Sequence, residues 1–240
     1  MEKDVKATIR RVHCPEGTVV PILRTQKEDL IRAKNFSQTH LANVHPDTVE
    51  KPGEHIVALT PLAKTTYYGV SGRLNVYSLQ LNKDQQSTVQ MWIENGTPEK
   101  YASLQAGWML FFVNLNQHIM LDSTVGGKDV GYWPKAIIPQ LSDNASLVAW
   151  GGMATGPPDG DSPPMGNGHY PDGDFMKACF IKQLQTMDAA NNFVVPDEDG
   201  MNSFVDKQDC YGFEYLGYKL DWWTGREMWN VKCERQCRNC

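Results

Sequence analysis

The segment STVQMWIENGTPEKYASLQAGWMLFFV, residues 87–113, decides the fold class. Its two halves carry apolar residues at every second position, which are Val89, Met91 and Ile93 in the first half and Leu104, Ala106, Trp108 and Leu110 in the second. A period of two is typical of a half-buried β-strand. The Asn-Gly pair at 95–96 predicts a turn between the two strands.

The same texture extends to both sides of this segment. Residues 55–61 (HIVALTP) and 72–81 (GRLNVYSLQL) predict further strands, and Gly-Gly and Asp-Gly pairs at 126–127, 159–160 and 172–173 predict turns. A short turn near residues 134–141 is the only later helical signal. Short strands at regular spacing favour a mainly β fold, either a β-sandwich or a barrel.

The chain divides into three parts. Residues 1–52 are interpreted as a leader, in which Thr25 and Glu28 form a capping box that predicts a short helix. Residues 53–222 form the β domain, and residues 223–240 form a Cys-rich tail.

Composition excludes several classes of protein. The chain has 240 residues, a formal net charge of −5 and a sequence pI of about 5.7. A nucleic-acid-binding domain would show a basic face or stripe, and we therefore expect no nucleic-acid partner. No apolar run is long enough to cross a bilayer, so no membrane association is expected. The N-terminal residues MEKDVKATIRR lack the apolar core of a signal peptide.

Neither the cysteines nor the aspartates predict a metal site. Cys233, Cys237 and Cys240 contain only one C-x-x-C spacing, so disulfides or free thiols are favoured over a zinc knuckle. The two PDGD strings, at 158–161 and 171–174, are better explained by turn chemistry than by calcium. Three sequons, at Asn35, Asn95 and Asn144, permit glycosylation of a secreted chain.

Eight short sequence strings follow one another along the chain in the order in which they occur in one protein family. They are CPEGTVVPILR at 14–24, His55 followed by YYGVSGRLNVY at 67–77, QAGW at 105–108, GYWP at 131–134, WGG at 150–152, PMGNGHY at 164–170 and CY at 210–211. Together they resemble the plant neprosin family of glutamic prolyl endopeptidases. The first string is similar to the activation peptide of that family, and the others are similar to its catalytic domain.

The resemblance implies a fold and a chemistry. Members of the family are described as secreted proteins with an antiparallel β-sandwich that uses no cofactor. Active members use two glutamates, one before Ala-Gly-Trp and one after Trp-Gly-Gly. In this chain the matching positions hold Gln105 and Met153.

Loss of the second carboxylate is the larger defect. One carboxylate must take a proton from water while its partner polarises the scissile carbonyl. An amide can still donate a hydrogen bond to the oxyanion, whereas a thioether neither takes up a proton nor donates. The resemblance therefore predicts an inactive pseudo-peptidase with no intact catalytic residue. Glu94 and Asp129 are considered as substitute acids, but we expect both to be solvated.

Two alternatives to the pseudo-peptidase remain. The first is an active endopeptidase that cleaves near proline at acidic pH. The second is an unstable product of a truncated gene model, because the stretch between Trp108 and Gly131 is short for the family and an internal block of strands is expected to be missing.

The resemblance also predicts a ligand and a location. An inactive member can still bind peptides or proline-rich proteins; a glycan ligand or no retained function are the alternatives. Trp92, Trp108 and Trp150 are candidates to line a cleft, although aromatic residues of a sandwich more often pack in the core. An extracellular or vacuolar location follows from the family alone.

Overall fold

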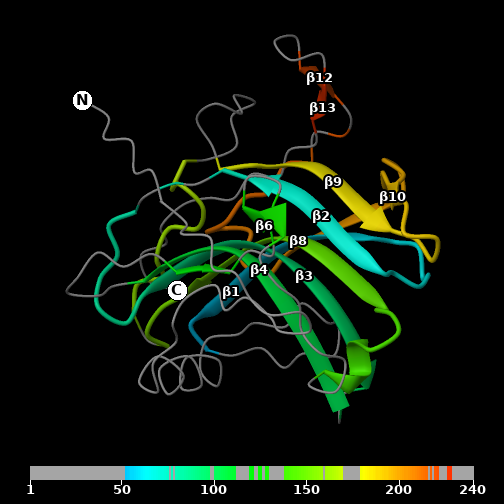
Figure 1. Ribbon diagram of the computed structural model, residues 1–240. Coiled ribbons are helices and arrows are strands. Elements are labelled where there is room, and N and C mark those ends of the chain that lie inside the picture. Colours follow the sequence, from blue (N-terminus) through cyan, green and yellow to red (C-terminus); the bar gives the residue numbers. More distant parts are fainter. Residues whose placement is uncertain are drawn as a thin grey trace.

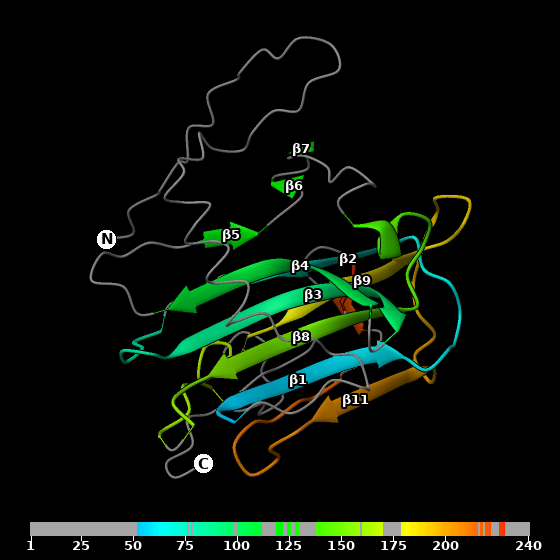
Figure 2. The ribbon, with the colours of Figure 1, turned by 90° about the horizontal axis from the view of Figure 1, so that it is seen from below.

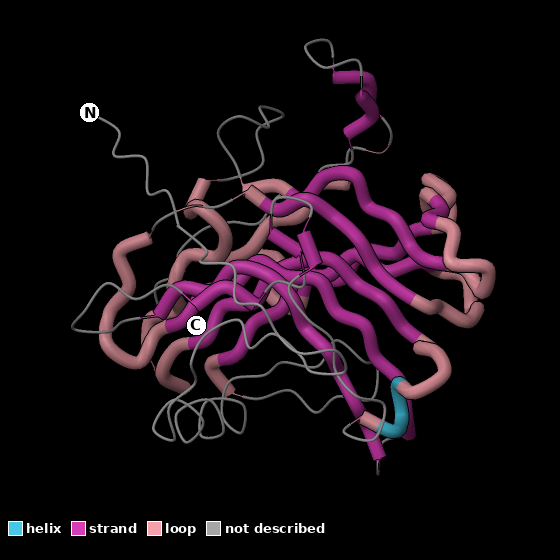
Figure 3. The backbone as a smooth tube through the Cα atoms, in the orientation of Figure 1, coloured by secondary structure: helices cyan, strands magenta, loops and turns pink. Residues whose placement is uncertain are grey.

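Strands dominate the computed structural model of the chain (Figures 1 and 3). The structure describes residues 52–75, 77, 79–97, 100–111, 119–121, 124–125, 128–129, 138–158, 160–169, 179–215, 217, 219–221 and 226–228. The leader up to residue 51, with the helix expected after Thr25, lies outside the described residues, as does the tail from residue 229.

Six strands form the larger sheet (Figure 2). In spatial order they are β11 (Met201–Val205), β1 (Glu54–Pro61), β8 (Leu147–Thr155), β3 (Gln86–Thr97), β4 (Lys100–Phe111) and β5 (Ile119–Leu121). Every neighbouring pair in this sheet is antiparallel. The hairpin of β3 and β4 is the segment whose alternation predicted strands.

The other strands form smaller sheets. A three-stranded sheet has the order β10 (Phe193–Val194), β9 (Ile181–Met187) and β2 (Gly69–Leu74). Two ribbons pair β6 (Thr124–Val125) with β7 (Lys128–Asp129), and β12 (Lys219–Asp221) with β13 (Arg226–Met228). The described helical element is one 3₁₀ turn, η1 (Pro139–Leu141), inside the range expected for it. None of the described helical segments is long and apolar enough to cross a membrane.

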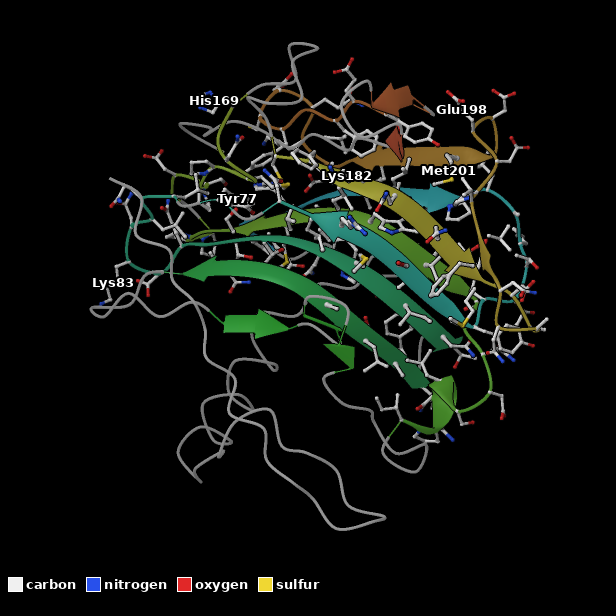
Figure 4. The ribbon with its side chains drawn as sticks, turned by 45° about the horizontal axis from the view of Figure 1, so that its top comes forward. Tyr77, Lys83, His169, Lys182, Glu198 and Met201 are labelled. Carbon is white, nitrogen blue, oxygen red and sulfur yellow. The ribbon has the colours of Figure 1, made fainter. Side chains whose placement is uncertain are left out.

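The core lies where the three-stranded sheet faces the larger one (Figure 4). Trp150 of β8 is fully buried there, and its indole Nε1 donates a hydrogen bond of 2.9 Å to the Ser71 carbonyl of β2. Gly72 leaves space for the Trp150 ring, because a Cβ at Gly72 would lie 3.3 Å from it. The mainly β, antiparallel fold is therefore confirmed, and the arrangement is compatible with the expected sandwich.

Two local expectations were wrong. The Asn95–Gly96 pair does not form the turn: it lies inside β3, and the strand continues to Thr97. Asn95 is held in the strand because its Nδ2 donates to the carbonyls of Gln140, at 2.9 Å, and Asn144, at 3.0 Å. The strand expected over 72–81 ends at Leu74, where the Asn75 side chain accepts a hydrogen bond from the Phe180 N–H.

Replacing Asn95 with alanine should lower the free energy of unfolding by about 2 kcal/mol, because two backbone carbonyls lose their donor. Asn202→Ala, at an exposed position of β11, is the matched control and should change stability by less than about 0.5 kcal/mol. Urea denaturation measures both. Equal effects of the two substitutions would contradict a role for Asn95 in fixing the 138–146 loop.

Candidate functional site

The face of the larger sheet that points away from the core is polar yet buried. On β3 this face carries Gln86, Thr88, Gln90, Trp92 and Glu94, which alternate with the core-facing Val89, Met91 and Ile93. We call this surface of β3 and its neighbours in β4, β8 and β1 the polar face. All five β3 side chains are buried, with Glu94 at 0% exposure and Gln90 at 3%. A solvated strand face would not show such burial, so this surface is an interior one.

A chain of hydrogen bonds crosses the polar face between β3 and β4. Gln90 Nε2 donates to Gln105 Oε1 at 3.0 Å, and Gln105 Nε2 donates to Ser103 Oγ at 3.2 Å. Ser103 Oγ in turn donates to Glu94 Oε1 at 2.8 Å. Each side chain donates to the next, and the chain ends at the Glu94 carboxyl.

Two glycines flank Gln90 in the sheet. Gln90 pairs with Gly107 of β4 on one side and with Gly151 of β8 on the other. A Cβ at Gly107 would collide with the Val89 carbonyl oxygen, and a Cβ at Gly151 would collide with the Val57 carbonyl oxygen. Glycine inside a strand often marks such a close backbone approach. The polar face therefore has no side-chain atoms immediately on either side of Gln90.

Gln105 and Met153 lie on opposite sides of the row formed by Gly107, Gln90 and Gly151. Gln105 pairs with Trp92, two residues from Gln90 in one direction, and Met153 pairs with Thr88, two residues away in the other. Diagonal neighbours in a sheet lie about 7–8 Å apart, so both positions flank Gln90. The two are offset from each other by four residues of β3, or about 13 Å along the strand.

Met153 has no polar chemistry to contribute. Its side chain is 0% exposed, and the register places it between Ile56 of β1 and Thr88 of β3. The Met153 N–H donates to Thr88 Oγ1 at 3.2 Å, which is a structural bond of the backbone. A thioether at this position cannot accept a proton from water.

The expectation that Glu94 is solvated was wrong. β3 continues three residues beyond Glu94, so Glu94 is not at a strand end, and its side chain is fully buried. A carboxylate away from water needs hydrogen bonds or a charge partner, and Ser103 supplies one such bond. The side chain of Asp129, the other candidate acid, lies outside the described residues.

The three candidate cleft tryptophans have different positions. Trp92 lies on the polar face and is fully buried, next to Gln105 in the register. Trp150 packs in the core instead. The backbone of Trp108 pairs with Val89 in β3, and its side chain lies outside the described residues.

Sequence reasoning missed the polar neighbours of the two motif positions. Gln86, Thr88, Gln90 and Ser103 occupy the alternate positions that a half-buried strand gives to solvent. The one feature that links them to the site is that they share a sheet face with Gln105. That feature can be recognised only when the pairing of the strands is known. Within the described ranges, no group of three or more His, Cys, Asp or Glu side chains can hold a metal ion.

A second polar contact lies at the edge of the core, away from the polar face. His55 Nδ1 of β1 is 3.0 Å from Asp206 Oδ2, just after β11, and the His55 ring lies 5.4 Å from the Tyr211 ring. Tyr211 Oη donates to the Pro163 carbonyl at 3.0 Å. These contacts join β1 to the loops at its end, so His55 is placed to stabilise the fold.

Two cysteines are described. Cys179 is a buried thiol of the core cluster, and Cys210, also buried, is disulfide-bonded. The three tail cysteines, considered above for zinc, lie outside the described residues.

A comparison with family models identifies the domain. The model named Neprosin matches residues 113–226, a range that includes β8 with Met153 and the three-stranded sheet partner β9. The β3–β4 hairpin, which holds Gln90, Glu94 and the QAGW string with Gln105, precedes the matched range. Its strand β3 pairs with β8, which lies inside that range. The motif order, the antiparallel β fold and this match agree, and residues 113–226 of the chain carry a neprosin-family domain.

Proposed function

We propose that this chain is a peptide-binding neprosin-family protein that does not hydrolyse its ligand. The observation that carries the proposal is Met153, a fully buried thioether at the position where the family resemblance expects a glutamate. Losing a general base typically slows catalysis by about 100- to 10,000-fold. Neither described carboxyl of the polar face is directly opposite Met153, because Glu54 of β1 pairs with Thr155 and Glu94 of β3 pairs with Leu147, whereas Met153 pairs with Ile56 and Thr88.

The remaining polar groups suit binding better than catalysis. The Gln105 amide is engaged on both sides, by Gln90 and by Ser103, so its orientation is fixed. Amides and hydroxyls that are held in place on a sheet face, with glycines beside them, can form hydrogen bonds with the backbone of an extended peptide. The family's substrate class supports peptides, and among them proline-rich segments, as the ligands.

The test is a cleavage assay on the full chain with proline-containing peptides at acidic pH, read by mass spectrometry. We expect no products from the natural sequence. The double variant Gln105→Glu, Met153→Glu should gain activity, and the matched variant Met153→Gln, which restores size and polarity at position 153 but leaves both positions without a carboxylate, should not. Cleavage by the natural sequence would overturn the proposal.

The unfolding curve of each variant completes this test. A carboxyl at position 153 would be buried, which raises its pKa, so it is neutral at acidic pH and increasingly destabilising as the pH rises above about 4.3, the unfolded value. The variant should therefore be less stable at pH 7 than at pH 4. If neither the natural chain nor the variants unfold cooperatively, the alternative of an unstable product is favoured.

A second candidate is an active endopeptidase in which Glu94 replaces the missing acid. One observation favours it: Glu94 is buried and connected to the Gln105 amide through Ser103. In that case the natural chain would cleave peptides, and Glu94→Gln would abolish cleavage while preserving side-chain volume. Ser103→Ala, which interrupts the connection, should then reduce the rate as well.

Family membership also supports an extracellular or vacuolar location, which we propose for this chain. Imaging of a fluorescent fusion of the complete natural gene product tests it, and retention in the cytosol would overturn it.

A further inference from the structure

Gln86, at the end of the polar face beyond Met153, is buried without satisfying its hydrogen bonds. Its side chain is 2% exposed, and neither Nε2 nor Oε1 has a hydrogen-bond partner in the part of the chain that the structure describes. Its register partner in β8 is Thr155, whose Oγ1 is also buried and without a partner there. A cross-strand pair thus brings together three polar atoms that lack hydrogen bonds.

Such a cluster opposes folding. Leaving a buried donor or acceptor unsatisfied costs about 1–3 kcal/mol for each group. The contrast with Gln90, four residues along the same face of β3, is direct, because the Gln90 amide donates to Gln105. Buried polar groups without partners are rare in folded proteins, and each calls for an explanation such as a ligand.

We propose that Gln86 and Thr155 form a subsite for a carboxamide side chain, asparagine or glutamine, of a bound peptide. This inference rests on the proposed peptide-binding function. The ligand's NH₂ would donate to Gln86 Oε1, and its carbonyl oxygen would accept from Gln86 Nε2, so that both ends of the amide are satisfied. The Thr155 hydroxyl supplies a third bond to the same group.

The atoms present select the ligand group. A carboxylate only accepts, so it would leave Gln86 Oε1 facing another acceptor, and an ammonium only donates, so it would leave Nε2 unsatisfied. An aliphatic group would leave all three atoms without bonds. A carboxamide offers one donor group and one acceptor, which matches Gln86.

The subsite lies within reach of a ligand that also contacts the centre of the polar face. Gln86 and Gln90 are four residues apart on β3, or about 13 Å, which an extended peptide of about four residues spans. At 2% exposure the face must change conformation before a ligand reaches Gln86. Association should therefore be slower than the 10⁵–10⁷ M⁻¹s⁻¹ that is typical of preformed surfaces, with ~10⁴ M⁻¹s⁻¹ expected.

The test is calorimetric titration of the full chain with three hexapeptides in which proline alternates with glutamine, glutamate or leucine. The Pro-Gln peptide should bind about 10- to 100-fold more tightly than the other two. Equal affinities would overturn the subsite and leave peptide binding standing. Binding of none of the three, or binding only of cellohexaose in a parallel titration, would overturn both the subsite and the proposed function.

Two variants separate recognition from folding. Gln86→Leu and Thr155→Val remove the polar atoms at similar volume, so they should preserve or raise the melting temperature, because no hydrogen bond in the described part of the chain is lost. Both should reduce the preference for Pro-Gln to within about threefold of Pro-Leu. An unchanged preference in both variants would overturn the proposal even where the folds are intact.

Discussion

Trp150→Ala is expected to lower the free energy of unfolding by about 4 kcal/mol, within the range measured for large aromatic side chains that are deleted from cores. Trp150 is fully buried between the two larger sheets, and its ring packs against Gly72 of β2. Removing it leaves a cavity and also deprives the Ser71 carbonyl of the indole N–H. Because Trp150 joins β8 to β2, the loss affects both sheets.

Trp150→Phe provides the control for this prediction. It keeps most of the apolar volume and removes the indole N–H, so the loss should be about half as large. Phe204→Ala removes an aromatic ring that is 50% exposed in β11 and should cost less than about 1 kcal/mol. Guanidinium denaturation, monitored by far-ultraviolet circular dichroism, measures all three, and a loss below about 1 kcal/mol for Trp150→Ala would contradict the packing described.

Gly151→Ala is expected to destabilise the chain by about 3 kcal/mol or more, although it adds one methyl group. The new Cβ would collide with the Val57 carbonyl oxygen and lie 2.9 Å from the Ala58 Cα. Both obstacles are backbone atoms of β1, so no side-chain rotation relieves the contact. The pairing of β1 with β8 must open, and this pairing lies in the interior of the larger sheet.

Gly200→Ala is the matched control. Its nearest obstacle is the Asp197 Cβ at 3.3 Å, and the loop between β10 and β11 can adjust, so we expect a change below about 1 kcal/mol. The same denaturation experiment compares the two. If Gly151→Ala unfolds at the same denaturant concentration as the natural chain, the register of β1 and β8 is not as described.

The sequence predicted the strands whose alternation is regular. β3 and β4 lie within residues 87–113, where alternation predicted them, because their core-facing positions hold apolar residues in turn. β1 lies where the apolar, β-branched run at 55–61 predicted a strand. The end of β2 and the place of the β3–β4 turn were not predictable. Both depend on hydrogen bonds to segments far away in sequence: the Asn75 side chain accepts one from the Phe180 N–H, and the Asn95 side chain donates one to the Gln140 carbonyl. Local turn propensity does not contain that information.

The candidate site was predicted at two positions and missed elsewhere. Motif spacing pointed to Gln105 and Met153, but it could not show that β3 runs between them and that Gln90 separates them. Alternation assigns a residue to one face of its own strand and says nothing about which strands are neighbours. The burial of Glu94 and Gln86 depends on which strands are neighbours, so the sequence alone does not predict it.

The two glycines beside Gln90 bear on how such a family evolves. Gly107 and Gly151 belong to the same short motifs as Gln105 and Met153, yet the backbone of the adjacent strand leaves no space for a Cβ at either glycine. Selection for a foldable chain alone would therefore preserve the glycines, while the residue two places away is free to drift once hydrolysis is no longer needed. The packing of the glycines alone can therefore keep such a motif recognisable, so the motif does not by itself report activity.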